Sequence, residues 1–167
     1  MVAYTLDELI PSSVFAKQII DYLTQQHQTI TFAESCTGGQ IASAFTAISG
    51  ASAVLNGSCV TYSNEIKHQW LGVREETLID FGAVSRECVE EMLVGIQKMA
   101  ESDYAIAVSG IAGPTGGTEL KPVGTVYIGL LTPSYSRVEK FHFEGTRDEV
   151  QESATQKAIN ILAKNLK

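Results

Sequence analysis

The stretch Thr31–Gly39 (Thr-Phe-Ala-Glu-Ser-Cys-Thr-Gly-Gly) carries the residue types of a reactive turn. It is typical of a short strand, a tight turn and the start of a helix. A serine at such a place suits either a nucleophile or an anion site, because the N–H groups of a helix start point outward there. The N–H groups of Thr37, Gly38 and Gly39 would then receive developing negative charge. The alternative is that Ser35 or Thr37 only caps the helix.

Polar side chains also follow the second strand that the sequence predicts, in the segment Tyr62-Ser63-Asn64-Glu65-Ile66-Lys67. This strand should end at the same edge of the sheet as the first, so we expect Tyr62, Asn64 and Lys67 to converge near Ser35. A serine nucleophile needs a base. The three histidines are poorly placed for that role (His27, His68 and His142).

Lys67 is therefore the candidate base. A lysine serves as a base only when its amine is neutral near pH 7, which requires a pKa roughly 3 units below its usual value. Partial burial and a neighbouring cation supply a shift of that size. The alternative is that Lys67 is a solvated residue on a short helix.

A glycine-rich loop, Ser109–Thr118, follows a later strand. Glycine lets the backbone approach a ligand closely, and its N–H groups form an anion-binding nest. The loop matches neither G-x-x-x-x-G-K-[ST] nor G-x-G-x-x-G before a helix, because no lysine follows and a strand comes next. A long glycine loop in a compact domain more often serves a site than acts as a flexible connector, which is the alternative.

Arg147 lies in the first turn of the last predicted helix. A positive charge there opposes the helix dipole, so helix stability does not explain it. A guanidinium matches phosphate or carboxylate with two parallel hydrogen bonds. The alternative is a surface arginine paired with Asp148 or another acid.

Composition limits the partners and the setting of the chain. Its 167 residues predict one domain, residues 1–167, with a sizeable core. The net charge of −7 argues against nucleic acid but not against a small phosphorylated ligand. The cysteines are odd in number and form no zinc pattern, so we expect a reduced, cytoplasmic setting (Cys36, Cys59 and Cys88). We expect no metal, because the histidines are scattered and no carboxylate pair has ligand spacing with them, and we expect no cofactor. We expect neither a signal peptide nor a membrane partner. Cys36 has no histidine pattern near it, so a Cys–His pair is not favoured.

Hydrophobic periodicity predicts helices that alternate with strands. The predicted helices are 13–27, 39–48, 65–71, 75–81, 86–101 and 147–165, and the predicted strands are 29–34, 54–62, 83–84, 104–109, 123–131 and 138–143. This alternation predicts an α/β fold, a three-layer α/β/α sandwich with a mixed, mostly parallel sheet. A short link makes the last strand pair antiparallel.

Several motifs, taken together and in order, resemble one family. They are Ala33–Gly39, Val60–Lys67, Leu71–Val73, Gly82–Ser85, Ser109–Thr118, Lys121–Val126 and Gly145–Arg147. From about residue 10 to residue 165, the chain resembles the CinA C-terminal-domain family, in its stand-alone form. The characterised members of this family are nicotinamide-nucleotide amidases.

The resemblance implies hydrolysis of the carboxamide of nicotinamide mononucleotide, which gives nicotinic acid mononucleotide and ammonia. It implies Ser35 as nucleophile, Lys67 as general base and Tyr62 as an aid to proton transfer or orientation. The N–H groups around Thr37, Gly38 and Gly39 would form the oxyanion hole, and Asn64 would help to hold the site. The ribose phosphate would bind to Ser109, Gly110, Gly113, Thr115, Gly116, Gly117 and Arg147. The family also tends to self-associate, so a homo-oligomer is expected.

Two other functions stay open from the sequence. The chain could be a non-catalytic phosphate- or nucleotide-binding paralogue, in which Ser35 is a cap or a ligand contact. It could also be a Ser/Lys hydrolase of another small amide. Replacing Ser35 separates the first alternative from the amidase, and replacing Arg147 separates the second.

Overall fold

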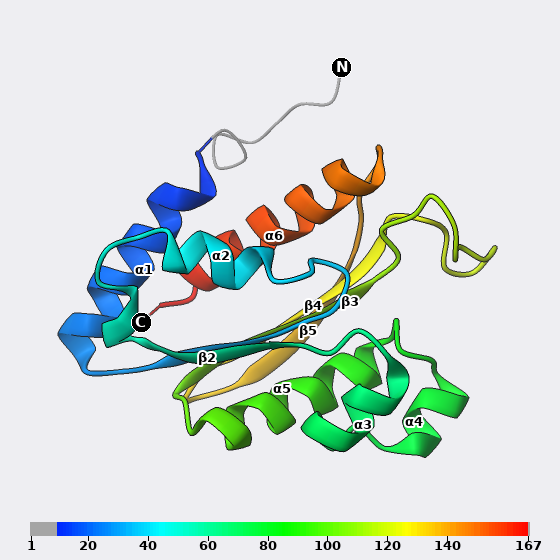
Figure 1. Ribbon diagram of the computed structural model, residues 1–167, viewed down its shortest axis with the longest axis horizontal. Helices are drawn as coiled ribbons and strands as arrows, with labels where there is room; N and C mark the ends of the chain where they lie inside the picture. Colours follow the sequence, from blue (N-terminus) through cyan, green and yellow to red (C-terminus); the bar gives the residue numbers. More distant parts are fainter. Residues whose placement is uncertain (1–9, 167) are drawn as a thin grey trace.

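The computed structural model describes residues 10–166 as a five-stranded sheet with helices on both faces (Figure 1). The strands are β1 (Ile30–Glu34), β2 (Leu55–Val60), β3 (Tyr104–Gly110), β4 (Thr125–Leu131) and β5 (Ser136–His142). Their order across the sheet is β2-β1-β3-β4-β5. β1 pairs in parallel with β2 and β3, whereas β4 is antiparallel to β3 and β5. Only β4 therefore runs against the others, and the predicted mixed, mostly parallel sheet is confirmed.

The helices form the two outer layers of the sandwich (Figure 1). α1 (Ser12–Gln26), α2 (Gln40–Thr46) and α6 (Arg147–Ala163) cover one face of the sheet. α3 (Asn64–Leu71), α4 (Glu75–Asp80) and α5 (Arg86–Ala100) cover the other. The predicted three-layer α/β/α architecture is confirmed. Within residues 10–166, no helix has the length and apolar character needed to cross a membrane.

Alternation along the central strands divides the buried side chains between two cores. Phe32 and Ile106 pack with the buried residues of α1, α2 and α6. Ala33 and Ala107 pack with the buried residues of α5. Small residues allow α5 to lie close to the sheet, since a Cβ added to Gly129 would lie 2.7 Å from Leu93 Cδ1.

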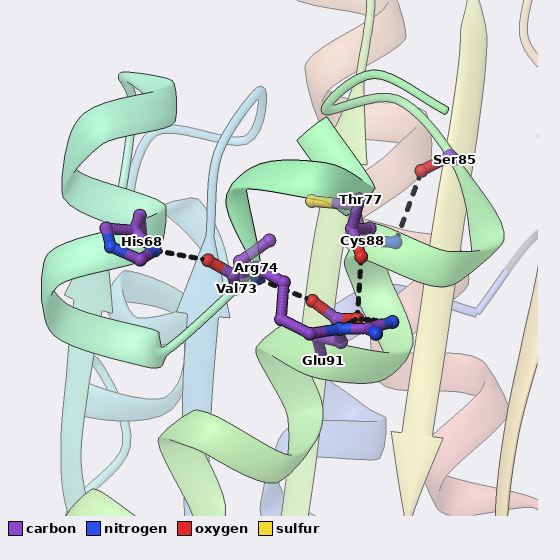
Figure 2. Close-up of polar contacts among 7 residues, drawn as sticks. All are labelled: His68, Val73, Arg74, Thr77, Ser85, Cys88 and Glu91. Carbon is purple, nitrogen blue, oxygen red and sulfur yellow. Dashed lines mark hydrogen bonds and ion pairs between the residues drawn. The ribbon is translucent and has the colours of Figure 1, made fainter. Parts of the chain in front are cut away.

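Close packing also sets the position of α3 against α5. A Cβ on Gly95 of α5 would lie only 1.9 Å from the carbonyl oxygen of Leu71, the last residue of α3. The start of α4 is fastened to α5 by Glu91, whose carboxylate accepts hydrogen bonds from Arg74 N at 2.7 Å and Thr77 Oγ1 at 2.8 Å (Figure 2). The helix layer below the sheet is therefore one packed unit.

The segment Ala83–Val84 differs from the prediction. It was expected as a brief strand, but it forms a bend between α4 and α5. Gly82 has a φ of 77°, and the Ala83 carbonyl accepts a hydrogen bond from Ser109 Oγ at 2.8 Å. The backbone of this segment thus bonds to a side chain instead of a neighbouring strand.

The two ends of the sheet have different connections. The carboxyl ends of β1, β2 and β3 lead into the Ser35 turn, the α3 start and the glycine loop. At the opposite end, β4 and β5 are joined by the turn 132–135, where Thr132 Oγ1 accepts hydrogen bonds from Ser134 N and Tyr135 N. Thr146 and Glu149 form a capping box at the start of α6.

Candidate active site

A cavity of about 250 Å³ lies beyond the carboxyl ends of the parallel strands β1 and β3. From β1 the chain continues to β2 on one side, whereas β3 lies on the other side. Such a change of direction leaves a crevice at the strand ends in open α/β sheets. The lining comes from the Ser35 turn, the start of α3, the bend before α5, the glycine loop and Arg147.

Ser35 and Lys67 meet in this cavity. Lys67 Nζ lies 3.1 Å from Ser35 Oγ and 2.6 Å from the carbonyl oxygen of Thr61. Ser63 caps α3 by accepting a hydrogen bond from Ile66 N, so Lys67 lies in the first turn of that helix. Because its side chain points inward, Lys67 is only 1% exposed.

Burial lowers the pKa of Lys67 from its usual 10.5. A negative charge on Cys88 or Cys36 would oppose this shift. However, burial raises the pKa of Cys88 to about 11 and that of Cys36 to about 12, so both thiols are protonated at neutral pH. No acidic side chain among residues 10–166 forms an ion pair with Lys67. A neutral Lys67 amine can donate to Thr61 and accept the proton of Ser35.

Two glycines complete the turn after Ser35. Gly38 and Gly39 have φ values of 62° and 99°, which glycine adopts without the penalty of a side chain. Gly38 N donates to the carbonyl oxygen of Ser35, and Gly39 N donates to the carboxylate of Glu34. These two expected oxyanion donors therefore already have acceptors in the protein. The remaining N–H groups of the turn are those of Cys36 and Thr37.

Arg147 closes the cavity from the start of α6. Its Nη2 donates to Tyr62 Oη at 2.7 Å, and its Nη1 donates to the carbonyl oxygen of Gly113 at 2.8 Å. Both acceptors are uncharged. Within residues 10–166, Arg147 forms no ion pair, so its charge is not neutralised by a carboxylate.

The glycine loop approaches the Ser35 turn closely at its first residues. A Cβ on Gly110 would lie 2.7 Å from Val126 Cγ2 and 3.0 Å from Cys36 Sγ. Ser109 is buried, and its hydroxyl donates to the carbonyl oxygen of Ala83. A glycine at position 110 is therefore needed for the loop to reach the cavity.

The structure brings together most of the site residues that the sequence predicts. The cavity is lined by Ser35, Tyr62, Lys67, Ser109, Gly110, Gly113, Thr115, Gly116 and Arg147. It is not lined by Thr37, Gly38, Gly39, Asn64 or Gly117. Asn64 is the exposed first residue of α3.

Sequence reasoning missed three residues near the site. Ala83 and Val84 line the cavity, although the motif Gly82–Ser85 was given no role at the site. Glu34 is fully buried beside Ser35. An acid at the end of an apolar strand was the available signal for Glu34, because carboxylates are rarely buried without partners.

Residues 12–166 match the family model of the CinA C-terminal domain. The chain belongs to this family. Among CinA-like proteins, those of Endomicrobium trichonymphae and Thermotoga neapolitana are 51% and 45% identical to it over 144 and 149 residues. These alignments cover 86% and 89% of the chain, but only 34% and 36% of the two relatives. The chain thus spans about a third of the length of the curated relatives it matches.

Solved CinA-family structures have the same fold over nearly their whole length. The competence damage-inducible protein A of Klebsiella pneumoniae matches with a TM-score of 0.91 at 36% identity, covering 94% of this chain and 98% of that one. A competence/damage inducible protein of Agrobacterium tumefaciens matches with a TM-score of 0.89 at 36% identity, covering 97% of each chain.

Side chains that could ligate a metal do not gather in the part of the chain that the structure describes. Within residues 10–166, no group of three or more His, Cys, Asp or Glu residues is arranged to hold a metal ion. The reactive groups that this CinA-family cavity presents are the hydroxyl of Ser35 and the amine of Lys67.

Proposed function

We propose that this chain is an amidohydrolase that converts nicotinamide mononucleotide to nicotinic acid mononucleotide and ammonia. The observation that carries the proposal is the 3.1 Å contact between Ser35 Oγ and the buried amine of Lys67. A serine next to a base with a lowered pKa is the arrangement of an activated nucleophile.

The reaction follows from these two groups. Lys67 takes the proton of Ser35 while Oγ attacks the carboxamide carbon, which gives a tetrahedral oxyanion. The C–N bond then breaks, Lys67 returns the proton to the nitrogen, and ammonia leaves an ester on Ser35. A water molecule attacks this ester and gives one proton to Lys67. The bond to Ser35 Oγ then breaks, Lys67 returns the proton to Oγ, and the carboxylic acid leaves.

The position of Arg147 at the cavity favours a phosphorylated substrate. Its guanidinium is held at the cavity by two uncharged acceptors, Tyr62 and Gly113. A phosphate group would replace these uncharged acceptors with an anionic one, which a guanidinium can bind through two parallel hydrogen bonds. The carboxamide would then lie at Ser35 and the ribose phosphate near Arg147.

An ammonia-release assay tests this function. The purified chain is incubated with nicotinamide mononucleotide, nicotinamide riboside or nicotinamide, with Ser35→Ala as the matched control. We expect ammonia from the mononucleotide, much less from the other two compounds, and none from the variant. Calorimetry should show that Ser35→Ala still binds the mononucleotide, because the phosphate contacts are intact.

Two results would overturn the proposal in different ways. A folded wild-type protein that binds the mononucleotide without releasing ammonia is a non-catalytic binding module. Equal rates with the riboside and the mononucleotide would instead show a hydrolase of small amides that does not recognise phosphate.

A further inference from the structure

Glu34 is a buried carboxylate that the proposed mechanism does not use. It is the last residue of β1, directly before Ser35, and its exposure is 0%. Its Oε2 accepts hydrogen bonds from Thr37 Oγ1 at 2.7 Å, Gly39 N at 3.1 Å and Ile41 N at 3.1 Å. Its Oε1 accepts one from Ala42 N at 2.9 Å.

Hydrogen bonds take the place of a counter-charge for this carboxylate. Within residues 10–166, Glu34 forms no ion pair with a cationic side chain. Its four partners are N–H and O–H donors, and three of them are backbone amides of the turn and of α2. A buried charge is tolerated when hydrogen bonds satisfy its oxygens.

The same hydrogen bonds shape the segment that carries Ser35. The chain from residue 35 to residue 42 folds around the carboxylate, with donors at positions 37, 39, 41 and 42. On the outer side, Gln151 Nε2 of α6 donates to the carbonyl oxygen of Cys36 at 2.6 Å. The Ser35 hydroxyl is in contact with Lys67 Nζ.

We propose that Glu34 is a positioning residue for the nucleophile: its carboxylate fixes the turn 35–42 so that Ser35 Oγ stays within reach of Lys67 Nζ. This inference rests on the proposed function, because it assumes that Ser35 attacks the substrate. Glu34 does not line the cavity in which the substrate would bind. It acts through the backbone, and a misplacement of about 1 Å can cost about 10²-fold in rate.

The four hydrogen-bond donors around Glu34 require a carboxylate of this length at position 34. Glutamine has the same shape, but its amide nitrogen would face an N–H or O–H donor where the carboxylate has an acceptor. Aspartate keeps the charge, but its side chain is one methylene shorter and cannot reach all four donors. Both replacements should therefore make the turn less rigid without disrupting the packing of the hydrophobic core.

The variant Glu91→Gln is a matched control for the Glu34 variants. Glu91 also accepts hydrogen bonds from a backbone amide, Arg74 N, and from a threonine hydroxyl, Thr77 Oγ1 (Figure 2). However, it lies between α4 and α5 and does not line the cavity. Glu91→Gln should lower stability by breaking the same types of hydrogen bond together with the ion pair to Arg74, and it should leave the chemistry of Ser35 unchanged.

The experiment measures Ser35 reactivity separately from turnover. Wild type, Glu34→Gln, Glu34→Asp and Glu91→Gln are treated with an alkyl fluorophosphonate, and phosphonylation of Ser35 is followed by mass spectrometry. In this step the Ser35 O–P bond forms, the P–F bond breaks, fluoride leaves and Lys67 takes the proton. The kcat and KM for nicotinamide mononucleotide and the melting temperature are measured on the same samples.

We expect both Glu34 variants to be labelled about 10²-fold more slowly than wild type, with kcat reduced in proportion and KM within a few-fold. Glu91→Gln should melt at a lower temperature but be labelled at the wild-type rate. Glu34 variants that are folded and labelled like wild type would overturn this inference alone. A wild-type protein that is neither labelled nor active would overturn the proposed function instead.

Discussion

The guanidinium of Arg147 donates a hydrogen bond to the phenol of Tyr62 across 2.7 Å, although the two residues lie 85 positions apart in the chain. This contact links the start of α6 to the connection between β2 and α3. The family resemblance implied that Tyr62 aids proton transfer or orientation. In this structure its hydroxyl is engaged by the residue expected to bind phosphate.

Replacing Arg147 with methionine should weaken the recognition of phosphate. Charge-assisted hydrogen bonds contribute about 1.5–3 kcal/mol each, so the KM for nicotinamide mononucleotide should rise at least tenfold. The low activity on nicotinamide riboside should not change, because that substrate has no phosphate. Steady-state kinetics with both substrates checks this prediction. An equal loss on both substrates would mean that Arg147 acts on the chemistry.

The pH dependence of the reaction should report Lys67. A general base works when it is neutral, and burial lowers the pKa of Lys67 below 10.5. The value of kcat/KM should therefore rise with pH and level off below pH 10.5. The measurement is a profile of kcat/KM from pH 5.5 to pH 10, with Lys67→Arg as an inactive control at every pH. A profile that still rises at pH 10 without any sign of levelling would contradict a base with a lowered pKa.

The same buried amine should affect the pH dependence of folding. The folded state has the lower pKa, so between that pKa and 10.5 the unfolded chain binds more protons. The wild-type free energy of unfolding should therefore increase, through the contribution of Lys67, as pH rises through that window. Lys67→Met removes the effect, so its stability relative to wild type should be highest at low pH and fall toward pH 10.5.

Urea unfolding of wild type and Lys67→Met at several pH values tests this. The matched control is Lys17→Met, because Lys17 is exposed and paired with Asp21. If Lys17→Met and Lys67→Met differ from wild type in the same way at every pH, the burial of Lys67 is not the cause of the effect. Lys67→Met should also lose 10²- to 10⁴-fold in rate, the usual contribution of a general base.

Gly95→Ala should destabilise the protein and reduce its activity. Alanine normally stabilises a helix relative to glycine by about 0.5–1 kcal/mol. Here the added Cβ would lie 1.9 Å from the Leu71 carbonyl oxygen, so α3 must move away from α5 and carry Lys67 with it. We expect a net loss of about 2 kcal/mol, measured by urea unfolding. Gly57→Ala is the control, since nothing lies within 4 Å of its Cβ.

Cys36 should be inert in the folded protein. It adjoins Ser35, but burial raises the pKa of its thiol to about 12, and only the thiolate reacts readily. Iodoacetamide at pH 7.5 should leave the activity unchanged, and Cys36→Ala should keep turnover within a few-fold. Peptide mapping after alkylation, with a denatured sample as control, checks the modification. Rapid inactivation that tracks alkylation of Cys36 would contradict this prediction.

The sequence predicted the layers of the fold because helix and strand periods alternate clearly along the chain. It also grouped Ser35 with Lys67, since both follow strands whose carboxyl ends share one edge of the sheet. The burial of Lys67 could not be read from spacing, because it depends on how closely α3 packs on α5 at Gly95. The prediction of a strand at Ala83–Val84 was wrong. The Ala83 carbonyl accepts a hydrogen bond from the Ser109 hydroxyl instead of from a neighbouring strand.

The partners of the turn amides could not be predicted either. Whether Gly39 N is available to a substrate depends on the direction of the Glu34 side chain, which a motif does not encode. The Glu34 carboxylate accepts hydrogen bonds from four donors of this segment. The turn therefore has fewer free N–H groups for a substrate than its glycines suggest. The motif thus predicted the position of the nucleophile better than the groups around it.

The exposed turn between β4 and β5 has a practical consequence. Pro133 and Ser134 lie at the end of the sheet opposite the cavity, and both are exposed. A flexible peptide inserted between them would meet solvent, whereas Ser35, Lys67 and Arg147 would keep their surroundings. This turn is therefore the place to attach a fluorophore or a surface tether to the working protein.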